Sequence, residues 1–252
     1  MSRKPRESSK TRVYHVMVRG INKQQIFYED EDCAAFLRIL TEVKNICSFK
    51  IHSYCLMGNH VHILVEEKDP GTLDTFMKRI TVRFVYWYNR KYERSGHLFQ
   101  DRFKSEAVED AKYFCTVVRY IHRNPLKAGL VQKLDEYKYS SYADIINDKK
   151  GLVDTELIYS YIPRDRFEEF CNMETSDVCL DVPEYNEVKM PDAKVLEMIK
   201  KKTRCQSVSE FQQLGADKKA ECYKKLLESG ASLRQISRLT GEGIGAIRYK
   251  TK

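Results

Sequence analysis

Two histidines separated by one apolar residue are the first candidates for chemistry in this sequence. His60 and His62 follow a Gly-Asn pair and lie within an aliphatic stretch. In a β-strand, side chains alternate between the two faces, so both imidazoles point one way and Val61 points the other. Two imidazoles on one sheet face supply half of a metal site. Two polar residues on the exposed face of a half-buried strand would give the same pattern.

A later segment offers the groups that would complete such a site. Tyr120 and Asn124 are four residues apart, which places them on one face of a helix. Asn124 offers a carbonyl oxygen as a third, hard ligand, and Tyr120 offers a phenolic nucleophile. A phenol has a pKa of about 10, so the metal or a nearby base must activate it. His122 is a conceivable base, but it faces away from Tyr120, and we interpret it as structural.

The elements that position these residues follow from hydrophobic periodicity. Strands are expected at 13–19, 49–57, 60–66 and 98–108, and helices at 33–47, 73–92 and 111–123. Pro125 should stop or kink the last helix, with a short helix at 126–131 after it. The order β-α-β-β-α-β plus one helix is the ferredoxin-like split arrangement, an α+β fold with two helices on one face of an antiparallel sheet. We expect the histidines on the open face.

The pair Gly58-Asn59 predicts a two-residue hairpin turn. The resulting register pairs Met57 with His60, Cys55 with His62 and Ser53 with Leu64. Met57, Cys55 and Ser53 then share the histidine face. A His/His/Cys zinc site stays open in this register, although cysteines of this kind are more often buried packing residues.

The composition indicates an ordinary soluble globular protein with a moderate excess of positive charge. The formal net charge is +8, which suits a polyanionic partner. The 8 cysteines form no C-x-x-C pair, and neither a secretory leader nor an apolar run of ~18 residues is apparent. We therefore expect reduced thiols, a cytoplasmic location and no membrane contact.

The chain divides into four parts by composition. A basic tail covers 1–12, the catalytic domain 13–147, a partly acidic connector 148–191 and a helical domain 192–252. Within the last part, Ser232 should cap a helix at 233–239, and a Gly-rich turn at 240–243 leads to a final helix at 244–249. Ile236, Leu239, Ile244 and Ile247 would face inward. This pattern predicts a helix-turn-helix, whose Arg248 and Lys250 suit a phosphate backbone.

Four stretches together carry a family resemblance over roughly 12–145. They are Tyr14 to Gly20, Met57 to His62, Gly96 to Phe103 and Tyr120 to Leu130. In this order they resemble the single-tyrosine HUH transposases, and most closely the branch of REP-associated tyrosine transposases. The helical C-terminal part is similar to appendages seen in this group.

The resemblance implies an HUH nuclease fold and a specific reaction. His60 and His62 would be metal ligands with Asn124 as the third, and the metal in the family is Mg²⁺ or Mn²⁺. Tyr120 would attack a phosphate of single-stranded DNA, in a hairpin or repeat, and form a 5′-phosphotyrosine from which the strand is rejoined elsewhere. Candidate contacts to the DNA backbone are Arg19, Arg79, Arg83, Arg102 and Lys104. Related enzymes include homodimers and monomers, and the sequence favours neither.

Two other functions remain open at this point. A DNA- or RNA-binding regulator derived from a transposase would keep the fold and the helix-turn-helix without catalysis. A structural zinc protein would bind Zn²⁺ stoichiometrically and unfold on chelation. The joint presence of His60, His62, Tyr120 and Asn124 favours the enzyme, a metal-dependent endonuclease and strand transferase.

Overall fold

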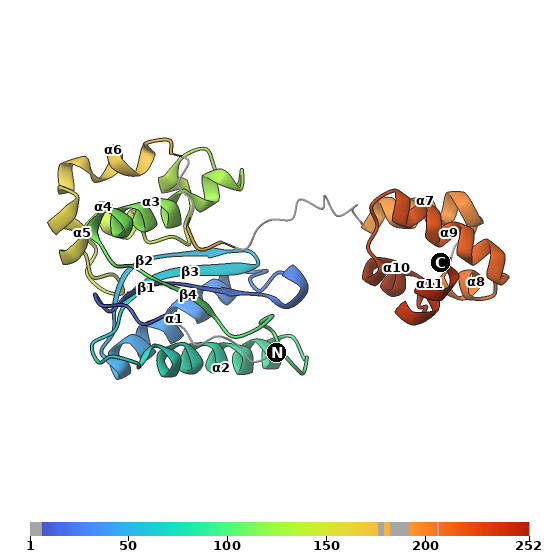
Figure 1. The fold of residues 1–252 in the computed structure, drawn as a ribbon, viewed down its shortest axis with the longest axis horizontal. Coiled ribbons are helices and arrows are strands. Elements are labelled where there is room, and N and C mark those ends of the chain that lie inside the picture. The colour runs from blue at the N-terminus through green and yellow to red at the C-terminus, as the bar shows by residue number, and fades with distance from the viewer. Residues whose placement is uncertain (1–6, 176–178, 182–191, 206, 252) are drawn as a thin grey trace. The chain divides into compact units, whose positions relative to one another are not determined.

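In the computed structural model, four strands form one antiparallel sheet in the N-terminal part of the chain (Figure 1). They are β1 (Val13–Arg19), β2 (Lys50–Met57), β3 (His60–Glu66) and β4 (Lys104–Ala107), in the order β2-β3-β1-β4. This is the strand order of the ferredoxin-like split arrangement, so the expected α+β fold is confirmed.

The structure describes residues 7–175, 179–181, 192–205 and 207–251. The chain divides into two units, 1–181 and 182–252. Each unit has its own hydrophobic core among the described residues. Within these ranges no helix is both long enough and apolar enough to cross a membrane.

β4 is much shorter than the strand expected at 98–108. Residues 98–103 contact the end of β1 through isolated hydrogen bonds, such as Gln100 N–H to the Arg19 carbonyl at 2.9 Å. β1 ends at Arg19, and the turn η1 (Ile21–Lys23) turns the chain away from the sheet. The residues before Lys104 therefore have no continuous partner strand.

Helices cover both faces of the sheet (Figure 1). α1 (Asp30–Cys47) and α2 (Leu73–Lys91) pack against each other on one face, as expected. α3 (Ala111–Lys127) lies on the other face, in contact with β2 and β3. The prediction that this second face is open was wrong. The apolar side of α3 closes it with the buried residues Phe114, Val117, Val118 and Ile121.

α3 continues through Pro125 without a break, which differs from the expected stop at this residue. Asn124 keeps its place one helical turn after Tyr120, although a residue before proline usually avoids helical geometry. Both side chains are buried against the sheet, and this packing outweighs the local preference. The short helix expected at 126–131 does not form, because α3 ends at Lys127 and Gly129 adopts φ +66°.

Residues 148–181, which the sequence assigned to a connector, belong to the N-terminal unit. After the turn η2 (Leu134–Glu136) come α4 (Tyr142–Ile146), α5 (Glu156–Tyr161), η3 (Arg164–Arg166) and α6 (Phe167–Asn172). α5 and α6 pack on α3. Their residues Ile158, Phe167 and Cys171 lie in the same core as the sheet, because short helices bury their apolar side most effectively against a larger layer.

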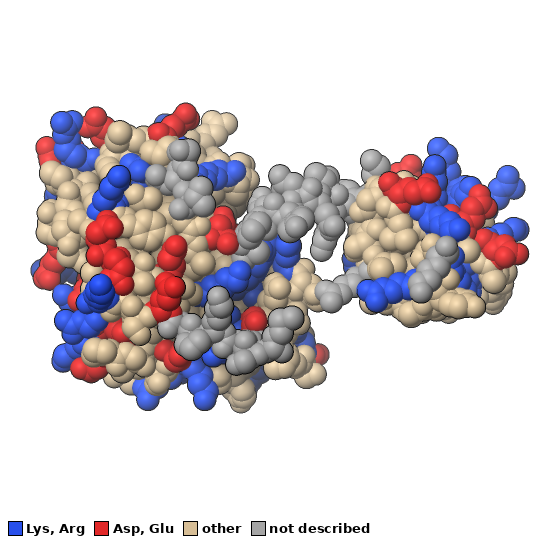
Figure 2. All heavy atoms as spheres, viewed as in Figure 1, with Lys and Arg blue, Asp and Glu red and all other residues tan. Residues whose placement is uncertain are grey.

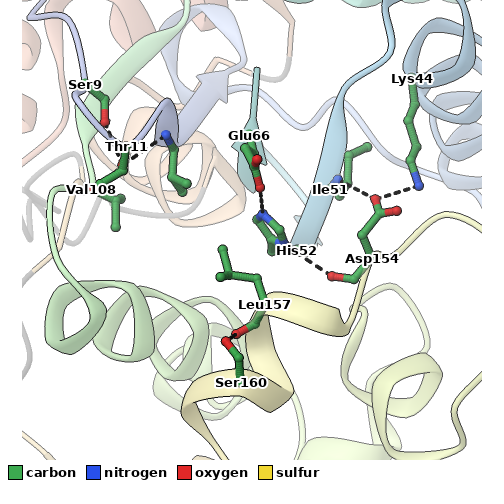
Figure 3. Close-up of polar contacts among 11 residues, drawn as sticks. Ser9, Thr11, Lys44, Ile51, His52, Glu66, Val108, Asp154, Leu157 and Ser160 are labelled. Atoms are coloured by element: carbon green, nitrogen blue, oxygen red, sulfur yellow. Dashed lines mark hydrogen bonds and ion pairs between the residues drawn. The ribbon is translucent and has the colours of Figure 1, made fainter. Parts of the chain in front are cut away.

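The outer edge of β2 is fully hydrogen-bonded to the segment 137–154. Asp154 bonds both backbone groups of Ile51, through its N–H at 2.7 Å and its carboxylate at 2.9 Å, and it also pairs with Lys44 at 2.7 Å (Figure 3). Ser141 bonds both backbone groups of Tyr54. The Leu56 N–H donates to the Tyr139 carbonyl at 2.9 Å, and the Tyr137 hydroxyl donates to the Leu56 carbonyl at 2.7 Å.

The C-terminal unit is helical, as its sequence pattern predicts. It contains α7 (Asp192–Thr203), α8 (Val208–Gln212), α9 (Ala216–Glu228), α10 (Leu233–Thr240) and α11 (Ile244–Lys250). The Ser232 side chain accepts the Gln235 N–H and caps α10. Gly241, at φ +70°, ends α10, and three residues lead into α11. Ile236 and Ile247 are fully buried between these helices, whereas Ile244 is half-buried.

Candidate active site

The two histidines lie on the sheet face that α3 covers. The pairing of β2 with β3 matches the expected register, with Met57 opposite His60 and Cys55 opposite His62. The imidazole centroids of His60 and His62 are 5.0 Å apart. His62 is fully buried and His60 is partly exposed. The turn that the sequence predicts thus brings both rings to one place.

Each histidine has its Nδ1 atom held by a neighbouring side chain. The Nδ1 of His60 faces Asn59 Oδ1 at 2.6 Å, and the Asn59 amide nitrogen donates to the Lys23 carbonyl at 3.3 Å. The Nδ1 of His62 faces the Nε2 of His15 at 3.0 Å. Both histidines therefore keep Nε2 for a further partner. Among the described residues, the buried Nε2 of His62 has no hydrogen-bond partner.

Tyr120 approaches the histidines from α3. Its ring centroid lies 5.7 Å from that of His62 and 5.9 Å from that of His15, in edge-on contacts. The Asn124 amide nitrogen donates to the Tyr120 carbonyl at 2.9 Å, so its Oδ1 is not used in that bond. Lys127 places its ammonium group 4.6 Å from the centre of the Tyr120 ring. The structure thus brings Tyr120 to the histidines, and Asn124 lies one helical turn after Tyr120 on α3.

A carboxylate from far along the chain meets the Tyr120 hydroxyl. This hydroxyl donates a hydrogen bond to Asp181 Oδ2. Burial raises the pKa of Tyr120 above its ordinary value of 10, and the hydrogen bond and charge of Asp181 raise it further. The Tyr120 side chain is therefore a neutral phenol at neutral pH, and it needs a proton acceptor before it can attack a phosphate.

Burial keeps the imidazoles neutral. It lowers the pKa of His60 to about 4, with Arg19 lowering it further and Asp181 opposing the change. Burial also holds the pKa of His62 well below 6.5, and that of His15 at about 3. Neutral imidazole is the form that ligates metals.

These residues fit a divalent metal with two nitrogen ligands. His60 and His62 would bind it through Nε2, and the unpartnered buried Nε2 of His62 is the atom that such an ion would satisfy. The Asn124 amide oxygen is the candidate third ligand. Among the described residues, no group of three His, Cys, Asp or Glu side chains could hold a metal. An amide oxygen is therefore the type of third donor that this site offers.

Cys55 shares the histidine face but is a weak candidate for a zinc site. Its thiol donates to the Met57 sulfur at 3.6 Å. Burial raises its pKa above the ordinary value of 9.0, whereas zinc binds the thiolate. His122 is also buried and its Nε2 contacts the Ser141 hydroxyl at 2.8 Å, away from Tyr120, as its place on the helix predicts.

The basic candidates fall into four groups. Arg19 is opposite His60, and Lys104 is opposite Met17, which in turn pairs with His62, so both belong to the histidine face. Arg102 is exposed on the segment before β4. Arg79 and Arg83 belong to α2 on the opposite face, so the structure does not bring them to the histidines. Arg79 contacts the Cys47 sulfur, and Arg83 pairs with Glu42 at 3.0 Å.

The last group, Arg248 and Lys250, lies on α11 in the C-terminal unit. Figure 2 shows basic and acidic side chains interspersed on the visible face of the N-terminal unit, so the positive charge does not form one patch there. Placement on the histidine face therefore distinguishes the basic candidates better than charge density does.

Sequence reasoning missed three residues of this site: His15, Lys127 and Asp181. His15 had a local signal, because a histidine within an apolar strand must be buried or functional. Lys127 lies seven residues after Tyr120, two helical turns further on the same face. It was missed because the helix was expected to end at residue 123. Asp181 had no signal, since it lies in a segment without regular structure.

Comparison with known proteins identifies chains that are similar in sequence and in fold. Residues 8–124 match the protein family described as transposase IS200-like. A curated Haemophilus influenzae protein named as a REP-associated tyrosine transposase is 29% identical over 105 residues, covering 37% of this chain and 59% of its own length. The chain thus spans less than two thirds of that relative. A solved structure of a REP-associated tyrosine transposase bound to a REP hairpin superposes with a TM-score of 0.51 at 20% identity, covering 73% of this chain and 96% of the other. That likeness confirms the HUH fold.

Proposed function

We propose that this chain, whose residues 8–124 match the IS200-like transposase family, is a transposase of that kind that cuts and rejoins single-stranded DNA. The observation that carries the proposal is the convergence of Tyr120 from α3 with His60 and His62 from β3. A nucleophile and two metal ligands from elements far apart in sequence meet in one half-buried place. A protein that only bound DNA would not require this arrangement.

The proposed reaction begins with the Tyr120 phenol. Its proton passes to Asp181, the carboxylate to which the hydroxyl already donates. The Tyr120 oxygen then forms a bond to the scissile phosphorus while the bond from phosphorus to the 3′ oxygen breaks. The departing 3′ oxygen takes up a proton from the solvent, so the products are a 5′-phosphotyrosine and a free 3′-hydroxyl. A second 3′-hydroxyl later attacks the same phosphorus, releases Tyr120 and rejoins the strand, so the phosphodiester energy is conserved.

The other residues of the site orient the reacting groups. When Mg²⁺ or Mn²⁺ is bound, it supplies Lewis acidity to the scissile phosphate. His60, His62 and Asn124 would hold the ion. Arg19 and Lys104, on the same face, would bind neighbouring phosphates. Lys127, against the Tyr120 ring, adds positive charge close to where the phosphate must lie.

The C-terminal unit would supply a second contact with DNA. We propose that α10 and α11 act as a helix-turn-helix, with Arg248 and Lys250 against the phosphate backbone. Arg248 and the neighbouring Tyr249 are exposed, and Tyr249 is 83% accessible. Replacing Arg248 and Lys250 together by alanine should weaken duplex binding for all sequences and reduce its salt dependence. An unchanged salt slope would remove these residues from the interface.

An adduct assay tests the catalytic proposal. The protein is incubated with labelled single-stranded hairpin DNA and Mn²⁺, and the expected product is a protein–DNA adduct that survives denaturation. Tyr120→Phe should abolish it. Tyr113→Phe is the matched control, because Tyr113 is also on α3 and also donates to a carboxylate, that of Glu106. An adduct that persists in Tyr120→Phe would identify another nucleophile, and binding without any adduct across a broad hairpin library would favour the non-catalytic regulator.

A further inference from the structure

His15 lies directly behind one of the candidate metal ligands. In β1, Met17 pairs with His62 and His15 pairs with Leu64, so His15 and His62 share one face of the sheet. Their side chains meet diagonally, with His15 Nε2 3.0 Å from His62 Nδ1. Both imidazoles are fully buried, with 0% exposure. Neither ring can exchange this contact for water without opening the domain.

A hydrogen bond between two neutral imidazoles has two possible arrangements. If His15 donates from Nε2, His62 must carry its own proton on Nε2 and cannot bind a metal there. If His62 donates from Nδ1, its Nε2 keeps a free lone pair. Among the described residues, His15 Nδ1 and His62 Nε2 are both buried without a hydrogen-bond partner, so either arrangement leaves one buried N–H unsatisfied. Only the second arrangement leaves His62 Nε2 with a lone pair that a metal could use.

His60 has the second arrangement, with Asn59 as the acceptor in place of a histidine. Asn59 Oδ1 lies 2.6 Å from His60 Nδ1, and an amide oxygen can only accept, so His60 must donate from Nδ1. The bond from the Asn59 amide nitrogen to the Lys23 carbonyl fixes which end of the amide faces His60. His60 therefore carries its free lone pair on Nε2.

We propose that His15 is a positioning residue that does for His62 what Asn59 does for His60. Its Nε2 accepts the Nδ1 proton of His62, holds the ring in place and leaves His62 Nε2 free toward the metal. This inference rests on the proposed metal site. It assigns to His15 no contact with the DNA or with the metal. A partner that orients a ligating histidine typically contributes 10–100-fold to metal affinity.

Metal binding in the absence of DNA tests this role. The affinity of the full-length protein for Mn²⁺ is measured by electron paramagnetic resonance of the free ion. We expect His15→Leu, which removes the acceptor, to weaken Mn²⁺ binding by about 10–100-fold. His15→Gln keeps a carbonyl acceptor and should stay within a few-fold of the wild type. It also serves as the second variant if His15→Leu does not fold.

His122→Leu is the matched control. His122 is equally buried, at 1% exposure, and its Nε2 bonds to Ser141 rather than to a site residue. Its replacement should lower stability as His15→Leu does but leave Mn²⁺ affinity unchanged. In ¹⁵N-labelled protein with Mg²⁺, the proton of His62 should be on Nδ1. Wild-type affinity in folded His15→Leu, an equal loss in His122→Leu, a proton on His62 Nε2, or no Mn²⁺ binding by the wild type would each overturn the proposal.

Because these measurements contain no DNA, they separate this proposal from the catalytic one. A protein that binds Mn²⁺ through His62 but forms no adduct would refute the proposed reaction and leave the role of His15 intact. If the wild type forms the Tyr120 adduct and the folded His15→Leu variant binds Mn²⁺ normally, the role of His15 is refuted and the proposed reaction stands.

Discussion

The hydroxyl of Tyr120 donates its hydrogen bond to Asp181, a residue 61 positions later in the chain. The bond joins α3 to the last residue of the N-terminal unit. In the proposed reaction, Asp181 is both a proton acceptor and a negative charge beside a phenol that must become an anion. These two effects act on different measurable quantities, so they can be separated.

Asp181→Asn should lower the pKa of Tyr120 and also slow its reaction. The pKa falls because the acceptor and the negative charge that raise it are removed. The rate of adduct formation should nevertheless drop by about 10²-fold or more, because the proton loses its acceptor. The pKa is measured by NMR of ¹³C-labelled tyrosine, with Tyr120→Phe to assign the signal. Faster adduct formation in Asp181→Asn would show that this residue restrains Tyr120 instead.

The two candidate histidine ligands, His60 and His62, should differ in their contribution to stability. His62→Ala empties a fully buried position and should lower the free energy of unfolding by roughly 2–4 kcal/mol. His60→Ala, at a partly exposed position, should cost less than about 1 kcal/mol. Both variants should lose Mn²⁺ binding. Urea denaturation without metal, alongside Mn²⁺ titration, checks this, and equal stability losses would contradict the difference in burial.

Stability should decrease as the pH falls below neutrality. Burial lowers the pKa of His15 and of His122 to about 3, against an ordinary histidine value of 6.5. Between these values the unfolded chain binds more protons than the folded one. The contribution of these neutral histidines to the stability of the folded state is therefore complete above pH 6.5 and is lost progressively as the pH falls toward 3. Each histidine contributes a slope of up to about 1.4 kcal/mol per pH unit.

Urea unfolding in EDTA at pH 7, 6 and 5 measures this slope. His122→Asn should reduce the slope of stability against pH by the contribution of one histidine, because asparagine does not titrate. Stability that is constant or increases between pH 7 and pH 5 would be incompatible with neutral buried imidazoles.

Two arginines form a matched pair for mapping the DNA path. Arg19 lies opposite His60, whereas Arg79 is on α2, which covers the other face of the sheet. Arg19→Ala should weaken binding of single-stranded DNA and reduce its salt dependence by about one phosphate contact. Arg79→Ala should bind as the wild type does. Fluorescence anisotropy over a range of salt concentrations measures the affinity of both variants for single-stranded DNA. A larger loss of affinity in Arg79→Ala than in Arg19→Ala would place the DNA on the face of the sheet that α2 covers.

The sequence predicted what depends on neighbours in the chain. The hairpin register follows from Gly58-Asn59, and it correctly pairs Cys55 with His62. The relation of Tyr120 to Asn124 follows from helical spacing. The closed histidine face was not predicted, because the strand-and-helix order alone does not say what packs on the second side of a sheet.

Contacts between distant segments account for the rest. His15 and His62 are 47 positions apart, and their contact depends on the register of β1 against β3, which no local turn fixes. Asp181 contacts Tyr120 from 61 positions away. The packing of α5 and α6 on α3 was not predicted either, because the acidic composition of this part of the chain indicated a connector. The meeting of His60, His62 and Tyr120 was therefore predictable, whereas their contacts with His15 and Asp181 were not.

The hydrogen bonds along the outer side of β2 limit how two copies of the chain can associate. An edge strand with free backbone groups can pair with the same strand of a second molecule and extend one sheet across a dimer. Here the outward groups of Ile51, Tyr54 and Leu56 are already occupied within the chain. The other edge strand of the sheet, at which a second molecule could extend it, is β4, which has 4 residues. A homodimer of this protein would therefore have to form through side chains or through β4, and the long edge of the sheet is protected against self-association.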